Sequence, residues 1–193
     1  MRPVDQRDDP RAADLQPSIP SSKSTRLTVV AASADETTHL GEMVGRFVRP
    51  GDLILLRGPI GAGKTTFTQG LARGMGIVGR VTSPSFTLAN VYDERREALL
   101  YHLDLWRIRG PAEALGIGLD EYLTGEGVCV VEWPEVAEDV LPGELLRIRF
   151  EVMGDSRRIE LAAVGKRPSE LVEQIRDALG NASASGGVVA SGD

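Results

Sequence analysis

Apolar and polar positions recur with two different periods along this chain, and the changes of period mark the predicted elements. A strand is expected at 27–31. Ser33 and Glu36 then form a capping box that opens a helix. Its core face is marked by apolar residues at i, i+3, i+4 and i+7, namely Leu40, Met43, Val44 and Phe47. Arg49-Pro50-Gly51 ends this helix.

Short apolar runs in the middle of the chain predict strands. A strand is expected at 53–56, and the run at 128–131 has the length and the β-branched residues of a strand that is covered on both faces. Segments 88–92 and 98–105 read as two strands that are joined by the polar turn Asp93-Glu94-Arg95-Arg96. A helix is expected at 66–73, ending near Gly74 and Gly76.

The last third of the chain predicts helices and a hairpin. A short helix at 111–123 is interrupted by Gly116 and Gly118, and strands at 145–153 and 157–164 form a hairpin. A final helix at 169–179 places Leu171, Ile175 and Leu179 on one stripe. The order of elements predicts an α/β fold of three layers, with a mixed central sheet and helices on both faces.

Composition separates one folded domain from two polar ends. Residues 1–26 contain many charged residues, Pro and Ser but no aromatic residue, and 181–193 are rich in Ala, Ser and Gly. Such segments bury too little apolar surface to offset the entropy of ordering them. We therefore expect a disordered N-terminal extension at 1–26, a folded domain at 27–180 and a disordered tail at 181–193.

Charge and cysteine usage restrict the classes of function. The net charge of -6 argues against a broad face for nucleic acid, although a local basic patch around Arg95 and Arg96 stays open. The single cysteine, Cys129, lies in an apolar run and is expected to be a buried, inert thiol. No segment is long and apolar enough for a signal peptide or a membrane span, so we expect a cytoplasmic protein without a membrane partner.

One stretch of eight residues carries the clearest chemistry. It matches G-x-x-x-x-G-K-[ST] in full, follows the strand at 53–56 and opens the next helix: Gly58, Pro59, Ile60, Gly61, Ala62, Gly63, Lys64 and Thr65, with Thr66 after it. The glycines let successive backbone N–H groups turn toward phosphates, and the helix adds its unpaired N–H groups. Lys64 is expected to hold the β- and γ-phosphates, and the Thr65 hydroxyl to ligate Mg²⁺. The chain is therefore predicted to bind a nucleoside triphosphate in a P-loop NTPase fold.

Two carboxylates are candidates for the magnesium ion and the attacking water. Glu132 ends the apolar run at 128–131, where it is either a site residue or an ordinary surface glutamate; Trp133 after it either walls the site or simply packs. Asp104 shares a strand face with His102, which suits a metal or water-positioning role or a half-exposed polar strand face. His102 alone is more typical of a hydrogen-bonded structural residue than of a general base.

Segment Ser83-Pro84-Ser85-Phe86-Thr87 lies between the phosphate-loop helix and the next strand. Many phosphate-loop proteins place a segment that senses the γ-phosphate there, so Ser83 and Ser85 are candidate contacts to phosphate or Mg²⁺, with a plain turn as the alternative. None of Lys23, Lys64 and Lys166 lies in the [NT]-K-x-D motif that reads guanine, so guanine specificity is not indicated.

Taken in order, these segments resemble the TsaE family (formerly YjeE), the bacterial ATPase of tRNA threonylcarbamoyladenosine biosynthesis. The resemblance runs from about 33 to 164. It includes five segments: Ser33-Ala34-Asp35-Glu36-Thr37 with Leu40-Gly41, Gly61-Ala62-Gly63-Lys64-Thr65-Thr66, Ser83-Pro84-Ser85-Phe86, His102-Leu103-Asp104-Leu105-Trp106-Arg107 and Val131-Glu132-Trp133-Pro134-Glu135. Ser85 stands where threonine is usual, and Trp106 replaces a tyrosine; each keeps the hydroxyl or the aromatic ring.

The resemblance implies an ATPase that acts with a TsaB–TsaD complex in forming the modified adenosine 37 of tRNA, with tRNA contacting this chain at most indirectly. ATP and Mg²⁺ are the implied ligands, and Lys64, Asp104 and Glu132 the implied catalytic residues, with Thr65, Asp104 and Glu132 at the metal. Trp133 is implied to lie near the nucleotide or the partner, and the adenine near Glu36 and Thr37. The alternatives are a small-molecule P-loop kinase and a nucleotide-sensing scaffold that does not need hydrolysis.

Overall fold

The computed structural model describes residues 25–84, 88–94, 98–123, 126–184 and 190–191, and the statements below concern these residues. Ser85, Phe86 and Thr87 of the candidate γ-phosphate segment lie outside them. The same holds for Arg95 and Arg96 of the basic patch and for nearly all of the expected N-terminal extension.

Eight strands form one mixed sheet in the order β3-β4-β5-β2-β6-β7-β1-β8. Strands β4, β5, β2 and β6 are parallel to their neighbours in the centre, while β3 and the hairpin side are antiparallel. This confirms the expected mixed sheet. The strands are β1 Arg26–Ala31, β2 Leu53–Arg57, β3 Ala89–Glu94, β4 Ala98–Asp104, β5 Val128–Glu132, β6 Leu145–Met153, β7 Ser156–Val164 and β8 Ala190–Ser191.

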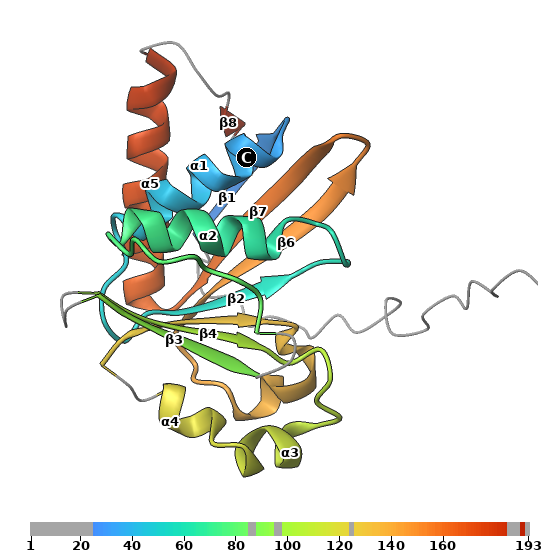
Figure 1. Ribbon diagram of the computed structural model, residues 1–193. Coiled ribbons are helices and arrows are strands. Elements are labelled where there is room, and N and C mark those ends of the chain that lie inside the picture. Colours follow the sequence, from blue (N-terminus) through green and yellow to red (C-terminus); the bar gives the residue numbers. More distant parts are fainter. Residues whose placement is uncertain (1–24, 85–87, 95–97, 124–125, 185–189, 192–193) are drawn as a thin grey trace, which may run out of the picture.

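Helices cover both faces of the sheet, as Figure 1 shows. Successive side chains of a strand point to opposite faces. In β2, Ile54 and Leu56 therefore join the core beneath three helices, α1 Ala34–Gly45, α2 Lys64–Gly74 and α5 Lys166–Ala184. Leu53 and Leu55 join a second core beneath α3 Pro111–Gly116, α4 Leu119–Leu123 and the 3₁₀ helix η1 Pro134–Val140. The three-layer α/β prediction is confirmed.

Element boundaries depart from the sequence prediction where the sequence pattern is weak. Asp93 and Glu94 belong to β3 rather than to a turn. By contrast, the predicted interruption of the helix at 111–123 is confirmed, since two short helices form there with Gly118 between them at φ +82°. Helix η1 had no predicted counterpart, because seven residues that begin with Pro134 show no helical period.

Helix α5 is longer at both ends than the expected segment 169–179. Its stripe of Leu171, Ile175 and Leu179 is buried, as the spacing predicts. Polar residues cover the other side of this helix. Across the described part of the chain, no helix combines the length and the apolar character needed to cross a membrane.

Helices α1 and α2 approach so closely that only glycine fits at their contact. A Cβ on Gly41 would lie 2.2 Å from the carbonyl oxygen of Phe67, and a Cβ on Gly70 would lie 2.0 Å from that of Thr38. Gly45 and Gly74 repeat the pattern one turn later, at 2.1 Å from carbonyl oxygens of the opposite helix. Small residues at i and i+4 allow such backbone contact. The start of α1 is thereby held beside the start of α2.

Candidate functional site

The phosphate-loop residues form the turn between β2 and α2, at the carboxyl end of the central parallel strands. Gly58, Gly61 and Gly63 have φ values of +147°, +75° and +102°, which side chains with a Cβ rarely adopt. Gly58 also faces the carbonyl oxygen of Phe150, only 2.7 Å from where a Cβ would be. The N-cap residue of α2 is Gly63, which has no side chain to cap the helix, so the N–H groups of the first turn can face an anion.

Lys64 begins α2 and is almost fully buried, with 5% of its surface exposed. Its Nζ donates to the carbonyl oxygens of Gly58 at 2.8 Å and Pro59 at 3.1 Å. Burial lowers the pKa of Lys64 from its usual value of 10.5, while the carboxylates of Glu132, Asp104 and Glu135 oppose that shift. The two carbonyl oxygens thus hold the Lys64 ammonium group against the loop that is predicted to bind phosphates.

The two candidate carboxylates end neighbouring parallel strands. Asp104 in β4 pairs in register with Glu132 in β5, and both are buried, at 7% and 3% exposure. The alternatives of a surface Glu132 and a half-exposed β4 face are therefore wrong. Glu132 Oε1 accepts a hydrogen bond from Thr65 Oγ1 at 3.0 Å and lies 2.9 Å from His102 Nε2. The fold joins the loop threonine to the carboxylate of β5.

Asp104 connects the site to the segment that follows α2. Its Oδ2 accepts a hydrogen bond from Ser83 Oγ at 2.8 Å, and its Oδ1 accepts one from the Trp106 N–H at 3.0 Å. Ser83 is thereby brought to the candidate site, whereas Ser85 lies outside the described residues.

Two tryptophans stand beside the loop lysine. The ring centroid of Trp133 is 3.8 Å from Lys64 Nζ, close enough for a cation–π contact. The rings of Trp106 and Trp133 lie 4.3 Å apart at an interplanar angle of 51°, and Trp106 is 45% exposed. Trp133 has φ +58° and ψ +50°, a left-handed conformation that is unusual for a large side chain. The chain direction changes at Trp133, so that its ring lies beside Lys64.

Glu36 and Thr37 lie at the start of α1. The Glu36 carboxylate accepts the Ala32 N–H at 2.8 Å, one residue earlier than a standard capping box, and Ser33 Oγ accepts the Glu36 N–H at 3.1 Å. Thr37 is buried, and its methyl group would be 3.4 Å from a Cβ on Gly63. Both residues contribute to the cap of α1, and Thr37 also touches the phosphate loop.

Sequence reasoning missed Arg157, at the start of β7. Its Nη2 donates to the carbonyl oxygen of Gly61 at 3.4 Å. Its Nη1 donates to the carbonyl oxygens of Gly154, Asp155 and Ser156 in the hairpin turn. This arginine ties the β6–β7 turn to the tip of the phosphate loop. No local pattern could have indicated a contact between residues 96 positions apart.

The oxygen atoms gathered here suit Mg²⁺ rather than a transition metal. Thr65 supplies a hydroxyl, and Glu132 and Asp104 supply carboxylates. Within the described ranges, no three His, Cys, Asp or Glu side chains form a ready-made metal cluster. Mg²⁺ needs none, since it keeps several waters and is held by one or two carboxylates together with substrate phosphates. The residues present fit that ion.

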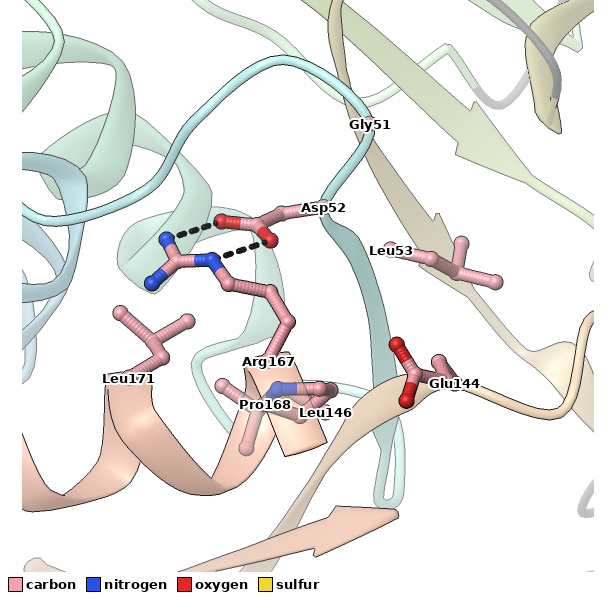
Figure 2. Close-up of a pocket in the computed structure, with 8 residues that line it drawn as sticks. All are labelled: Gly51, Asp52, Leu53, Glu144, Leu146, Arg167, Pro168 and Leu171. Carbon is pink, nitrogen blue, oxygen red and sulfur yellow. Dashed lines mark hydrogen bonds and ion pairs between the residues drawn. The ribbon is translucent and has the colours of Figure 1, made fainter. Parts of the chain in front are cut away.

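A cavity of about 40 Å³ lies at the other end of β2, away from the phosphate loop. Figure 2 shows Asp52 and Arg167 directed toward each other beside it, joined by bonds of 3.0 and 2.7 Å. Arg167 also donates to the carbonyl oxygen of Phe47 at 2.8 Å. The arginine thus fastens α5 to the entry of β2, a structural role away from the loop chemistry.

Comparisons with known proteins agree on one family. The family model described as "Threonylcarbamoyl adenosine biosynthesis protein TsaE" matches residues 31–159. The tRNA threonylcarbamoyladenosine biosynthesis protein TsaE of Bacillus subtilis is 44% identical over 142 residues, covering 73% of this chain and 88% of that protein. Its counterpart in Treponema pallidum is 41% identical over 129 residues, covering 67% and 94%. The crystal structure of Bacillus subtilis YdiB matches with a TM-score of 0.71 and 37% identity, covering 82% of this chain and 99% of that one.

Proposed function

The chain belongs to the TsaE family of threonylcarbamoyl adenosine biosynthesis proteins, and we propose that it is the P-loop ATPase of that process, acting with a TsaB–TsaD-type complex. One observation carries the proposal. The loop threonine, Thr65, is hydrogen-bonded to Glu132 at the end of the adjacent parallel strand, with Lys64 buried beside both. A loop that merely joined a strand to a helix would need neither the buried lysine nor the buried carboxylate.

The proposed mechanism is positioning together with electrostatic stabilisation. Loop N–H groups and the first turn of α2 bind the phosphates, and Lys64 adds its positive charge. Thr65, Glu132 and Asp104 would hold Mg²⁺, which when bound neutralises charge on the phosphates. Glu132 shares a hydrogen bond with Thr65 and is the carboxylate nearest to that ligand, while Asp104, which accepts a hydrogen bond from Ser83, supplies the second carboxylate.

Binding of the triphosphate does not require the site to break its internal bonds. Two of the three N–H donors of Lys64 are used by the carbonyl oxygens of Gly58 and Pro59, so the third can meet a phosphate. The Thr65 hydroxyl can donate to Glu132 while its lone pairs face the metal. We expect slow hydrolysis by the chain alone and faster hydrolysis with the partner complex, which can stabilise the closed site or add a cation.

Phosphate release from ATP and Mg²⁺ tests the proposal, measured with and without the TsaB–TsaD complex. We expect Lys64→Ala and Glu132→Ala to abolish stimulated hydrolysis, with Lys64→Ala also weakening ATP binding. Glu170→Ala, which removes an exposed glutamate of α5, is the control and should behave as wild type. Wild-type turnover by either site variant would contradict the assigned roles.

Two further measurements separate the alternatives: a screen for phosphorylated metabolites and an assay of tRNA modification. Phosphorylated metabolite in place of free phosphate would identify a kinase. Full support of tRNA modification by a Glu132→Ala protein that binds ATP without hydrolysing it would identify a nucleotide-sensing scaffold.

A further inference from the structure

His102 is a buried polar side chain whose role the proposed function does not explain. It lies in β4 between Leu100, which packs in the core beneath α1 and α2, and Asp104 of the candidate site on the same strand face. None of its surface is exposed to solvent. Its Nε2 is 2.9 Å from Glu132 Oε1. A histidine is an unfavourable choice for a core position unless its ring nitrogens do something there.

The chemistry of the carboxylate fixes which atom of that hydrogen bond is the donor. A carboxylate only accepts, so Nε2 carries the hydrogen and donates to Oε1. Oε1 therefore receives two donors from two elements, the imidazole of β4 and the Thr65 hydroxyl of α2. The other ring nitrogen, Nδ1, is buried and makes no hydrogen bond within the described residues. The polar function of this ring is thus concentrated in its contact with Glu132.

We propose that His102 is a positioning residue for Glu132: its Nε2–H holds the carboxylate in the rotation that faces Thr65. The proposal rests on the proposed function, because it concerns the carboxylate that would hold Mg²⁺. Removing a side chain that orients a metal-binding carboxylate commonly lowers metal affinity or activity by about 10- to 100-fold. If His102 only filled space, replacing it would change nucleotide affinity equally with and without Mg²⁺.

Two amide substitutions separate positioning from packing. In His102→Gln the side-chain nitrogen can reach the position of Nε2, whereas in His102→Asn it reaches only as far as Nδ1. Both variants remain polar. Comparing the two variants therefore tests whether an N–H donor is needed at the position of Nε2. Thermal unfolding of each variant measures its cost in stability separately.

The readout is the tightening of ADP binding by Mg²⁺, measured by calorimetry in EDTA and in magnesium, with the magnesium dependence of hydrolysis beside it. In His102→Asn we expect affinity in EDTA close to wild type, and the Mg²⁺ effect and turnover reduced by about tenfold or more. His102→Gln should recover most of both.

Equal behaviour of the Gln and Asn variants, or a loss of affinity in EDTA as large as in magnesium, would overturn the positioning role. The proposed function fails separately if the wild-type protein with its partner complex neither binds Mg²⁺-nucleotide nor hydrolyses ATP.

Discussion

At the scale of single residues, Lys64 shows how a binding site sets function against stability. Its ammonium group is withdrawn from water, which lowers its pKa, and the nearby Glu132 and Asp104 compensate only in part. The two loop carbonyls and the Trp133 ring give it polar partners without a full counter-ion. The protein therefore holds a costly charge at the place where phosphates would meet it.

Replacing Lys64 by Met should make the nucleotide-free protein more stable and unable to bind nucleotide. Methionine fills a similar volume and needs no desolvation of a charge. We expect a higher melting temperature at pH 7, by about 2–4 °C for each kcal/mol gained in a chain of this size. Calorimetric titration with ATP should show no binding. A lower melting temperature for Lys64→Met would mean that the loop contacts outweigh the cost of burial.

The pH dependence of this difference follows from the direction of the shift. The pKa of Lys64 in the folded protein lies below 10.5, so between the two values the unfolded chain binds more protons than the native one. Stability then rises with pH across that window. The cost is fully present below the folded-state pKa and disappears as the pH approaches 10.5. The gap in melting temperature between Lys64→Met and wild type should therefore narrow as the pH rises toward 10.5.

At the scale of elements, the contact between α1 and α2 places the start of α1 against the phosphate loop. Glycines on each helix lie against carbonyl oxygens of the other, and Thr37 reaches Gly63 only because the helices are so close. Separating the two helices should therefore lower the stability of the fold and remove Thr37 from its place beside the phosphate loop.

Gly70→Ala should destabilise the protein by about 1–3 kcal/mol, because the added methyl group would overlap the carbonyl oxygen of Thr38 at 2.0 Å. Gly180→Ala is the matched control. This glycine lies in α5 with no atom within 4 Å of a Cβ, so alanine should stabilise by about 0.5–1 kcal/mol. Urea unfolding measures both. If both substitutions stabilise, the helices can separate without cost and the close packing is not required.

The elements that sequence predicted well are those whose signal lies within a few residues. The phosphate loop, the buried strand that becomes β5 and the core stripe of α5 each follow from a local period or motif. The register that pairs Asp104 with Glu132 could not be read this way, because it depends on which strands become neighbours. The left-handed conformation of Trp133 could not be predicted either, because nothing in the dipeptide Trp133-Pro134 specifies a positive φ.

At the scale of the whole molecule, the sheet separates two tasks between its two ends. At the carboxyl end of β2 lie the phosphate loop, Lys64 and the carboxylates, where crevices of α/β sheets bind ligands. At the amino end, Asp52 and Arg167 hold α5 against the sheet. The G-x-x-x-x-G-K-[ST] motif predicted the site at the carboxyl end, whereas no sequence pattern predicted the ion pair at the amino end. Asp52 and Arg167 are 115 positions apart, and either could have been an ordinary surface charge.

This separation predicts that the two ends can be changed independently. Arg167→Met should lower stability by about 1–3 kcal/mol, between the values for exposed and fully buried ion pairs, because Asp52 loses its counter-ion and Phe47 its donor. Nucleotide affinity should stay within about twofold of wild type, since substitutions at distant sites with no shared partners usually add independently. A double-mutant cycle with Asp52→Asn, followed by urea unfolding and ATP titration, measures both quantities. Weaker ATP binding in Arg167→Met at unchanged stability would mean that α5 communicates with the phosphate loop through β2, and that the two ends of the sheet are coupled.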